Sequence, residues 1–341
     1  MRLVLALACT GCVYTSVDTD GRWSSLDDPC VPIPETRKLL ETKYSVISIP
    51  AGDTILYSGG ETVMQLDLET GRSEIVLRSD GISEFGVIGD RVVYYESNGD
   101  RAERRPIDVI IDHGASSTSR YERISPRHGL YNAGLVTTPA GIYWWTSRTG
   151  DPHGEREEWR WNPETGTVEA FPLRASSTVV ADEDSFLYFD DDRRLVVRPQ
   201  LPGPPTLAID WDDELQTPLP IALDGDDLFW VEHQVREPVE ASVDQLITRG
   251  ADGVERLLVE TRVVTAGAVD PAYVYFTRED STSNETRQNL YRVPRAGGPM
   301  ETFFTGETNS AVFDVRVDRC NVYWQVFTVE GGALYGREIT R

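Results

Sequence analysis

The sequence is short of positive charge and has no long apolar run. Lys and Arg number 33 against 56 Asp and Glu, which gives a formal net charge of −23 at pH 7. Nucleic acids and anionic lipids are bound through clustered Lys and Arg, so this balance argues against both as partners. No stretch approaches the roughly 20 apolar residues that a membrane helix needs. We therefore expect the body of the chain to lie outside the bilayer.

Recognisable catalytic and metal-binding motifs are missing as well. The chain has four histidines, each in a loop-like context: His113, His128, His153 and His233. Their spacing matches neither His-x-x-x-His nor His-Glu-x-x-His, and no Cys-x-x-Cys lies in the mature body. There is also no Gly-x-Ser-x-Gly elbow and no phosphate loop. We therefore predict no catalytic residue and no resident cofactor or metal from sequence motifs.

Acidic clusters such as 182–184, 190–192, 210–214 and 224–227 leave weak Ca²⁺ binding open as an alternative. Calcium needs several oxygen ligands on one tight loop, and none of these clusters has the twelve-residue calcium-loop spacing. Asp in a hairpin turn commonly accepts hydrogen bonds from its own backbone. We interpret these clusters as solvated turns.

Helical signals are scarce, whereas aromatic residues are abundant. The chain has only three Met, but it has eight Trp and fourteen Tyr, and no segment carries an apolar stripe of helical period. Seven segments share one pattern, a turn followed by a short apolar and aromatic strand; they are 53–57, 90–95, 141–145, 184–189, 226–230, 273–276 and 321–324. From Tyr57 to Trp324 the six intervals average about 44 residues, within the range of propeller blades.

Each repeat continues in the same way. In the first repeat, strand-like residues 63–68 and 74–77 flank the turn 69–72, which contains Gly. A run of small apolar residues, such as 265–269, precedes the aromatic strand and suits the crowded inner strand of a blade. The pattern predicts an all-β fold, a seven-bladed β-propeller of four-stranded antiparallel blades over residues 35–341.

Three sequence segments are similar to those of a known group of proteins. They are Val269-Asp-Pro-Ala-Tyr-Val-Tyr-Phe276, Val293-Pro-Arg-Ala-Gly-Gly298 and the Asp-x-x-x-Val-Tyr-Trp form at 318–324. With them the chain resembles the bacterial Tyr-Trp-repeat propellers, loosely like the TolB and YWTD-type propellers. The resemblance implies the fold, and it implies a mostly non-catalytic group. The YWTD tetrapeptide itself is absent, so a receptor-type assignment does not follow.

The first twelve residues resemble a bacterial lipoprotein signal. Met1-Arg2 precedes the apolar run Leu3–Ala8, and Thr10-Gly11-Cys12 follows. The resemblance implies lipidation at Cys12, with Cys9 as the alternative. An ordinary cleaved signal or an uncleaved N-terminus also stays open, because six apolar residues are fewer than the roughly 7–15 of a signal core. We expect residues 1–12 to be the signal, 13–34 a linker, and the protein to be exported, either lipid-anchored in the envelope (periplasm or outer membrane) or free in the periplasm.

The seventh repeat lacks one strand, and the N-terminal segment can supply it. Residues 35–43 align with 301–308, an outer strand of the sixth repeat, and are followed by an inner-strand pattern at 44–49. We predict that 35–43 closes the last blade, which removes an open sheet edge. Cys30 and Cys320 would then meet at the seam and form a disulfide, the alternative being two free thiols.

The longest connections, 98–127, 147–158 and 279–288, exceed tight-hairpin length, and long loops on a rigid scaffold often carry binding. The candidate binding residues are Trp159, Trp161, Tyr121 and Tyr131, whereas Trp144 and Trp145 are expected to pack between blades. The sequence favours a monomeric, non-catalytic cell-envelope propeller that binds a protein, peptide or glycan. The alternatives are an envelope enzyme of lyase, hydrolase or lactonase type with its site at the channel mouth, and a structural component of an envelope complex.

Overall fold

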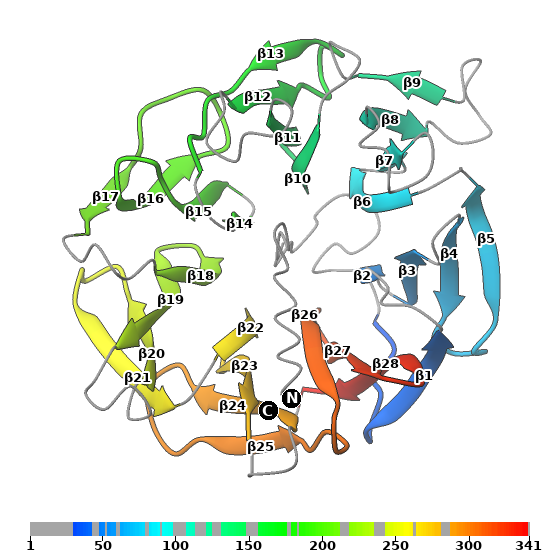
Figure 1. Cartoon of the computed structure of the whole chain (residues 1–341), viewed down its shortest axis with the longest axis vertical. Coiled ribbons are helices and arrows are strands. Elements are labelled where there is room, and N and C mark those ends of the chain that lie inside the picture. The colour runs from blue at the N-terminus through cyan, green and yellow to red at the C-terminus, as the bar shows by residue number, and fades with distance from the viewer. Residues whose placement is uncertain are drawn as a thin grey trace, which may run out of the picture.

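The computed structural model describes residues 30–42, 48–51, 53–58, 62–78, 82–88, 91–97, 107–112, 121–124, 131–147, 156–175, 179–182, 184–211, 218–234, 243–261, 264–280 and 287–339. These residues form strands β1 to β28, and no helix occurs among them. Correspondingly, this part of the chain contains no helix that is long and apolar enough to cross a membrane. The strands assemble into seven four-stranded antiparallel sheets arranged in a ring (Figure 1).

The blades follow one another along the chain, and the strands of each blade are ordered from the central channel outward. Blade 1 contains β2 (Ser48–Ala51), β3 (Thr54–Ser58), β4 (Thr62–Asp67) and β5 (Ser73–Arg78). Blade 2 contains β6 (Ile82–Ile88), β7 (Arg91–Ser97), β8 (Ile107–Asp112) and β9 (Tyr121–Arg123). Blade 3 contains β10 (Tyr131–Thr138), β11 (Gly141–Ser147), β12 (Arg156–Trp161) and β13 (Val168–Ala170). Blade 4 contains β14 (Val180–Ala181), β15 (Ser185–Phe189), β16 (Arg194–Pro199) and β17 (Leu207–Asp210).

The second half of the ring repeats this order. Blade 5 contains β18 (Leu219–Asp224), β19 (Asp227–Gln234), β20 (Val243–Arg249) and β21 (Glu255–Thr261). Blade 6 contains β22 (Val264–Val269), β23 (Tyr273–Glu279), β24 (Gln288–Pro294) and β25 (Glu301–Phe304). Blade 7 contains β26 (Ala311–Val317), β27 (Asn321–Thr328), β28 (Gly331–Glu338) and β1 (Arg37–Thr42). The predicted seven-bladed β-propeller is thereby confirmed, and each aromatic segment is the second strand of its blade.

The aromatic strands are continuous apolar runs because neighbouring blades cover both of their faces. In β27, Asn321 to Phe327 are almost all buried, whereas the outer strand β5 exposes most of its side chains. Seven apolar clusters form the core, and each lies between two adjacent blades. Trp144 and Trp145, on opposite faces of β11, belong to the clusters toward blades 2 and 4 respectively, as predicted.

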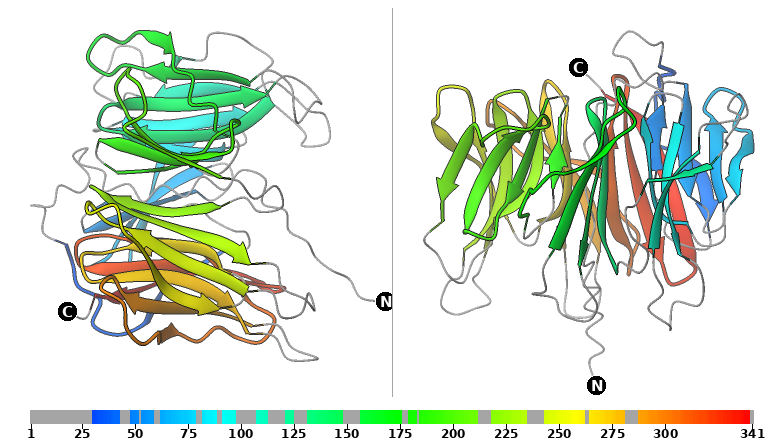
Figure 2. Two further views of the ribbon diagram at one scale, coloured as in Figure 1. Left: turned by 90° about the vertical axis from the view of Figure 1, so that its left-hand side faces the viewer. Right: turned by 90° about the horizontal axis from the view of Figure 1, so that it is seen from above.

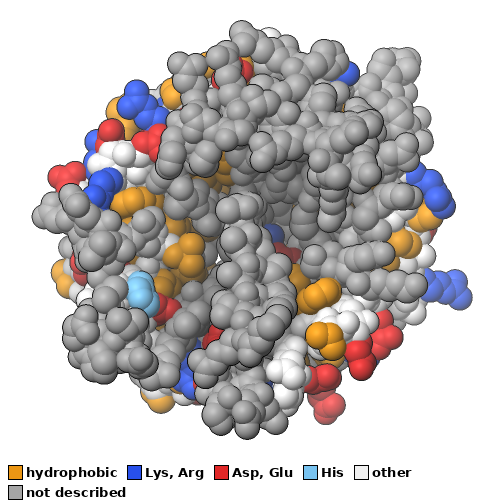
Figure 3. All heavy atoms as spheres, in the orientation of Figure 1, with side chains coloured by type: hydrophobic (Ala, Val, Ile, Leu, Met, Phe, Trp, Pro, Cys, Tyr) orange, Lys and Arg blue, Asp and Glu red, His pale blue; other side chains and the backbone are white. Residues whose placement is uncertain are grey.

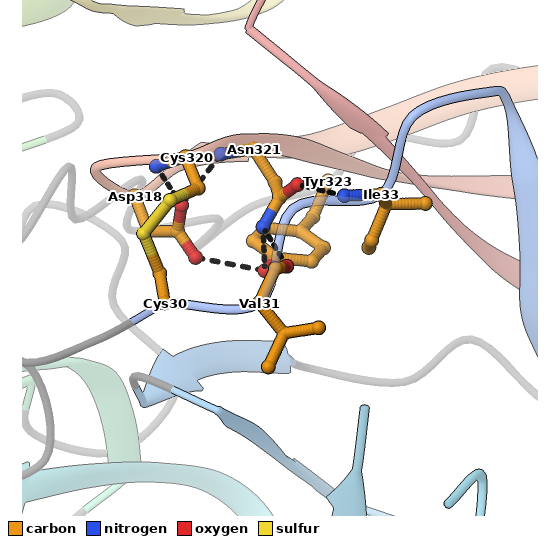
Figure 4. The surroundings of a disulfide bond; sticks show 7 residues. All are labelled: Cys30, Val31, Ile33, Asp318, Cys320, Asn321 and Tyr323. Carbon is orange, nitrogen blue, oxygen red and sulfur yellow. Dashed lines mark hydrogen bonds between the residues drawn. A yellow bond between two sulfur atoms is a disulfide. The ribbon is translucent and has the colours of Figure 1, made fainter. Parts of the chain in front are cut away.

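The ring closes through the N-terminal part of the chain. Strand β1 pairs antiparallel with β28, so residues 37–42 form the outer strand of blade 7, as the sequence predicted. Residues 44–47 of the expected inner strand lie outside the described residues, and β2 begins at Ser48. Cys30 and Cys320 form a disulfide with their Cα atoms 6.0 Å apart (Figure 4). The seam therefore joins segments 290 residues apart covalently as well as through backbone pairing.

The two faces of the ring differ in the connections that join their strand ends (Figure 2). On one face, which we call the long-connection face, the second strand of each blade ends and the third begins. Four of these connections span eight or nine residues: 98–106, 148–155, 235–242 and 280–287. On the opposite turn face, two or three residues connect each inner strand to the second strand.

Candidate functional site

Buried carboxylates on the turn face serve the fold. Asp270 Oδ1 accepts hydrogen bonds from the N–H groups of Ala272 and Tyr273 at 2.6 and 2.7 Å, and its Oδ2 accepts from the Tyr275 hydroxyl at 2.8 Å. The acidic turn at Asp182 follows the same rule, because its Oδ1 accepts from Asp184 and Ser185. These aspartates fix the turns between inner and second strands, and of the two Asp182 belongs to a cluster for which the sequence predicted a turn.

Blade 7 repeats this arrangement and extends it to the N-terminal segment. Asp318 accepts from the N–H groups of Cys320 and Asn321 and, at 2.7 Å, from the Tyr323 hydroxyl (Figure 4). Burial raises the pKa of Asp318, and its hydrogen bonds only partly oppose this. Burial, together with the nearby Asp318, also holds the pKa of Tyr323 well above its ordinary value. Tyr323 is fully buried and Asp318 largely so, and the pair supports the seam.

A third buried carboxylate lies on the channel side of the same seam. Asp314 has a left-handed backbone, with φ of 49°, within a bulge of β26. Its Oδ2 accepts from the backbone and hydroxyl of Ser48 at 3.2 and 3.1 Å and from Gln325 at 2.8 Å. Its Oδ1 accepts from Arg316 at 2.8 Å. Because Ser48 belongs to blade 1, this cluster connects the inner strands of blades 7 and 1.

Arginine side chains connect neighbouring blades on the turn face. Arg295 of blade 6 donates to both Asp224 and Asp227 of blade 5, and its guanidinium lies 5.2 Å from the Phe229 ring centroid. Arg337 of blade 7 likewise donates to a blade 6 backbone carbonyl at 2.9 Å. The planar, multiply donating guanidinium suits such sites better than an ammonium group does. Only Lys38 and Lys43 of the 33 basic residues are lysines, and the preference for Arg therefore has a structural use in this fold.

A different arrangement occurs at the other end of the interface between blades 5 and 6. His233 Nδ1 lies 2.7 Å from Asp244 Oδ1. The His233 side chain is 54% exposed, whereas that of Asp244 is only 9% exposed. His233 is not in a loop, as the sequence had suggested, but near the end of β19, where it is directly opposite Asp244 of β20. The pairing of β19 with β20 continues four residues beyond the aromatic Trp230, to Gln234.

Further polar side chains continue this group from blade 5 into blade 6. Thr261 is the cross-strand neighbour of Asp244, and its hydroxyl accepts from Arg278 Nη1 at 3.4 Å. Arg278 also pairs with Asp280. Asp280 in turn accepts from Asn289 and the Tyr291 hydroxyl. We call these seven residues the blade 5–6 polar cluster: His233, Asp244, Thr261, Arg278, Asp280, Asn289 and Tyr291.

The two carboxylates of the cluster, Asp280 and Asp244, have different surroundings. Burial alone would raise the pKa of Asp280, but hydrogen bonds from Tyr291, Arg278 and Asn289 lower it overall. Burial and the Asp280 hydrogen bond raise the pKa of Tyr291. Asp280 is therefore a fixed anion with several donors. Asp244 instead has an exposed imidazole as a partner.

The blade 5–6 polar cluster lies at the long-connection face. Its β19 and β23 members stand at the strand ends from which connections 235–242 and 280–287 start. A histidine side chain, in pale blue, is exposed on the face seen in Figure 3. Below the cluster, Val231, Leu246 and Phe276 belong to the apolar core between the two blades. The cluster is thus the outward polar end of a packed interface.

The candidate binding residues lie in different environments. Trp161 is only 2% exposed and packs between blades 2 and 3, with the Arg91 guanidinium 5.6 Å from its ring centroid. Trp159 is partly buried against the same core. Tyr121 and Tyr131 begin strands β9 and β10, but their side chains lie outside the described residues. The structure therefore buries Trp161 and partly buries Trp159, whereas the prediction for Tyr121 and Tyr131 lies outside the described side chains.

Several other expectations concern residues outside the described part. Cys9 and Cys12 belong to residues 1–29, which the structure does not describe. His113, His128 and His153 also lie outside the described residues. Within the described ranges, no group of three or more His, Cys, Asp or Glu side chains is arranged to hold a metal ion. The polar cluster was missed from the sequence because its members come from several strands of two blades, and no motif or spacing connects them.

Comparisons with known proteins show the fold but no family. No family model matches the chain, and no curated protein matches it. An oligogalacturonate lyase in complex with manganese is similar at a TM-score of 0.59 and 12% identity, covering 92% of this chain and 99% of that one. The Cps50 (Swd1) β-propeller domain of Myceliophteria thermophila is similar at 0.56 and 13%, with coverages of 90% and 100%.

TolB from Acinetobacter baumannii is also among the structural neighbours, at 15% identity with coverages of 74% and 66%. Its TM-score of 0.43 is too low to carry any functional weight. The neighbours thus include an enzyme as well as propellers that are not named as enzymes, and all of them share identities too low to transfer a function. A function for this chain therefore rests on its own residues.

Proposed function

We propose that this chain is an exported cell-envelope propeller that binds a protein, peptide or glycan through its long-connection face. The observation that carries the proposal is the contrast between the two faces. On the turn face, buried polar groups such as Asp270, Asp318 and Arg295 are engaged in holding strands and blades together. The long-connection face instead joins four pairs of strand ends by eight or nine residues.

The disulfide supports the exported location. A disulfide such as Cys30–Cys320 persists in an oxidising compartment, and disulfides are rare in the reducing cytosol. The strongly acidic composition supports a partner that is neutral or basic, because an acidic one would be repelled. For the anchor, we propose lipidation at Cys12. Cys12→Ser should release the protein from the membrane fraction, whereas Cys9→Ser should leave it there; the reverse result would place the lipid on Cys9.

The binding face can be tested with two matched deletions. Connection 148–155 joins strand ends on the long-connection face, and connection 113–120, which is equally long, joins strand ends on the turn face. Each is replaced by a four-residue Gly-Asn turn, and the purified variants are compared for capture of envelope proteins and on a glycan array. We expect the 148–155 replacement to lose the ligand and the 113–120 replacement to keep it. Equal binding by both variants would contradict the proposal.

A structural role in an envelope complex gives a different result. A scaffold would co-purify with a constant set of subunits, and both faces would be covered in the complex. Crosslinking of intact cells followed by mass spectrometry distinguishes the two cases. Crosslinks confined to strand ends of the long-connection face support a binding propeller, and crosslinks from both faces support a scaffold.

A further inference from the structure

We propose that His233 is the acid–base residue of a hydrolytic site at the long-connection face, held in place by Asp244 and acting on a neutral ester or lactone. This goes beyond the proposed binding function, since it assigns chemistry to a site that binding alone does not need. It rests on the blade 5–6 polar cluster and on no other part of the chain.

The geometry of the pair fixes the roles of the two imidazole nitrogens. An ionised carboxylate only accepts hydrogen bonds, so the 2.7 Å contact with Asp244 places the proton of neutral His233 on Nδ1. Nε2 is then the basic atom. Among the described residues Nε2 has no hydrogen-bond partner, and half of the side chain is exposed. An imidazole oriented through Nδ1 by a buried carboxylate, on a side chain that is itself half exposed, is the arrangement that general bases use.

Asp244 differs from the buried carboxylates described above because its hydrogen-bond partner is a histidine. Asp270 and Asp318 are satisfied by Tyr hydroxyls and turn N–H groups, and Asp314 by Ser, Gln and Arg. Those donors do not exchange protons near neutral pH, whereas histidine does. They are also largely buried, as a purely structural partner is expected to be. His233 is the one described histidine, and its side chain is 54% exposed.

The charges of the cluster limit which substrates can approach it. Asp244 and Asp280 contribute two carboxylates, and the one guanidinium of the cluster, Arg278, already pairs with Asp280. The chain as a whole carries a formal charge of −23. An anionic substrate such as a polyuronate would therefore be repelled. No hydroxyl or thiol of the described residues is hydrogen-bonded to His233, so water is the nucleophile in this proposal.

The proposed step balances without another reagent. Nε2 of His233 takes a proton from water while the water oxygen forms a bond to the ester or lactone carbonyl carbon. The resulting imidazolium is stabilised by the Asp244 carboxylate. When the bond from the carbonyl carbon to the alkoxide oxygen breaks, the Nε2 proton passes to that oxygen. One ester and one water become one acid and one alcohol, and neutral His233 is restored.

The test uses the full chain with p-nitrophenyl acetate and an uncharged short-chain γ-lactone as probes. We expect His233→Gln to lower kcat/KM for both probes at least tenfold, and Asp244→Asn to lower it by about tenfold. His113→Gln and His128→Gln are the matched controls and should each keep the wild-type rate. Equal losses in all three histidine variants, or no lactone hydrolysis above that of free imidazole, would overturn the proposal.

A merely structural role for the pair is distinguished by chemical rescue. Among the described residues, Asp244 is the group in contact with His233. We expect added imidazole to restore hydrolysis by the purified His233→Ala variant beyond the rate that imidazole gives in solution, while thermal unfolding of the variant stays cooperative. No rescue of a cooperatively unfolding His233→Ala variant contradicts the proposal. A His233→Gln variant that loses hydrolysis but still captures the partner would leave the proposed binding function intact. Hydrolysis that persists in the 148–155 replacement after partner capture is lost would overturn the binding function and not the hydrolytic site.

Discussion

The side-chain amide of Asn321 binds the backbone on both sides of Pro32. Its Oδ1 accepts from the Ile33 N–H at 2.8 Å, and its Nδ2 donates to the Val31 carbonyl at 3.0 Å (Figure 4). The same Nδ2 lies 3.0 Å from the Tyr323 hydroxyl. Asn321 is fully buried, so these contacts form away from water. One amide thus holds the entering chain against the last blade beside the disulfide.

Replacing Asn321 with Ala should destabilise the protein by about 2–4 kcal/mol, because buried backbone groups of residues 31 and 33 lose their partners. Urea unfolding, followed by intrinsic fluorescence, measures the change. Asn162→Ala is the control. Asn162 accepts from two turn N–H groups at an exposed position, and its loss should cost less than about 1 kcal/mol. Equal losses for both variants would contradict a special role for Asn321.

The disulfide should contribute strongly to stability because it closes a loop with a sequence separation of 290. Chain-entropy arguments give about 5 kcal/mol for loops of this length. We expect Cys30→Ser with Cys320→Ser to lower the unfolding midpoint while β1 still pairs with β28. Non-reducing peptide mapping of the native protein should recover Cys30 and Cys320 in one linked peptide. Two free thiols in the mature protein would show that the seam is closed by hydrogen bonds alone.

The repeat made most of the fold predictable. The second strands are apolar and aromatic on both faces because blades cover both faces, and this gives a pattern that needs no long-range information. The closing strand was predictable for a related reason, since residues 35–43 match the outer strand of another repeat. Inner strands need small residues, and Gly267 meets that need within its blade.

The candidate site was much less predictable. His233 and Asp244 are eleven residues apart across a connection of eight, and nothing in that spacing indicates that the two side chains meet. Arg278 and Asp280 join them only because blade 6 packs on blade 5. Trp161 was predicted to be a binding residue because it is aromatic and close to a long connection. Its ring instead fills the space between two blades. Composition identifies residue types, whereas the ring determines which of them are buried.

The buried Asp318 should make stability depend on pH. Its folded pKa is raised above the ordinary value of 3.8, so the folded state binds a proton more tightly than the unfolded chain does. Its stabilising contribution is therefore fully present below pH 3.8 and is lost as pH rises through the folded pKa. Asp318→Asn keeps an acceptor for the two turn N–H groups but does not titrate. The free energy of unfolding of wild type relative to Asp318→Asn should rise as pH falls from about 7 toward about 4, and a pH-independent difference would contradict this.

The two-carboxylate site of Arg295 should matter more than an exposed ion pair. Arg295 is 16% exposed and connects blade 6 to Asp224 and Asp227 of blade 5. We expect Arg295→Ala to cost more than about 1 kcal/mol, because the largely buried guanidinium loses its contacts with the Phe229 ring and with two carboxylates that are 53% and 40% exposed, and Arg295→Lys to recover only part of that loss. Arg256, half exposed and paired with Asp252 within one turn, is the control; Arg256→Ala should cost less than about 1 kcal/mol. Denaturant unfolding of the three variants decides the comparison.

Gly267 lies at a close approach between two inner strands. A Cβ built there would lie 2.4 Å from Cγ2 of Ile221 in blade 5 and 2.8 Å from the Tyr275 carbonyl oxygen in the paired strand. The carbonyl is fixed by the sheet, so the strand must shift, and overpacking of this kind costs about 1–3 kcal/mol. Gly267→Ala should therefore destabilise the ring by that amount in urea unfolding.

Two further variants separate crowding between blades from a general effect of alanine. Gly203 lies in a turn where an added Cβ meets only the Leu201 carbonyl oxygen at 3.9 Å, so Gly203→Ala should be neutral or slightly stabilising. Ile221→Ala removes the methyl group that Gly267→Ala would strike, although it opens a cavity of its own. If contact between the blades causes the loss, Ile221→Ala will cost less in the Gly267→Ala background than in the wild type. Strict additivity would instead assign the whole effect to the Tyr275 carbonyl within blade 6.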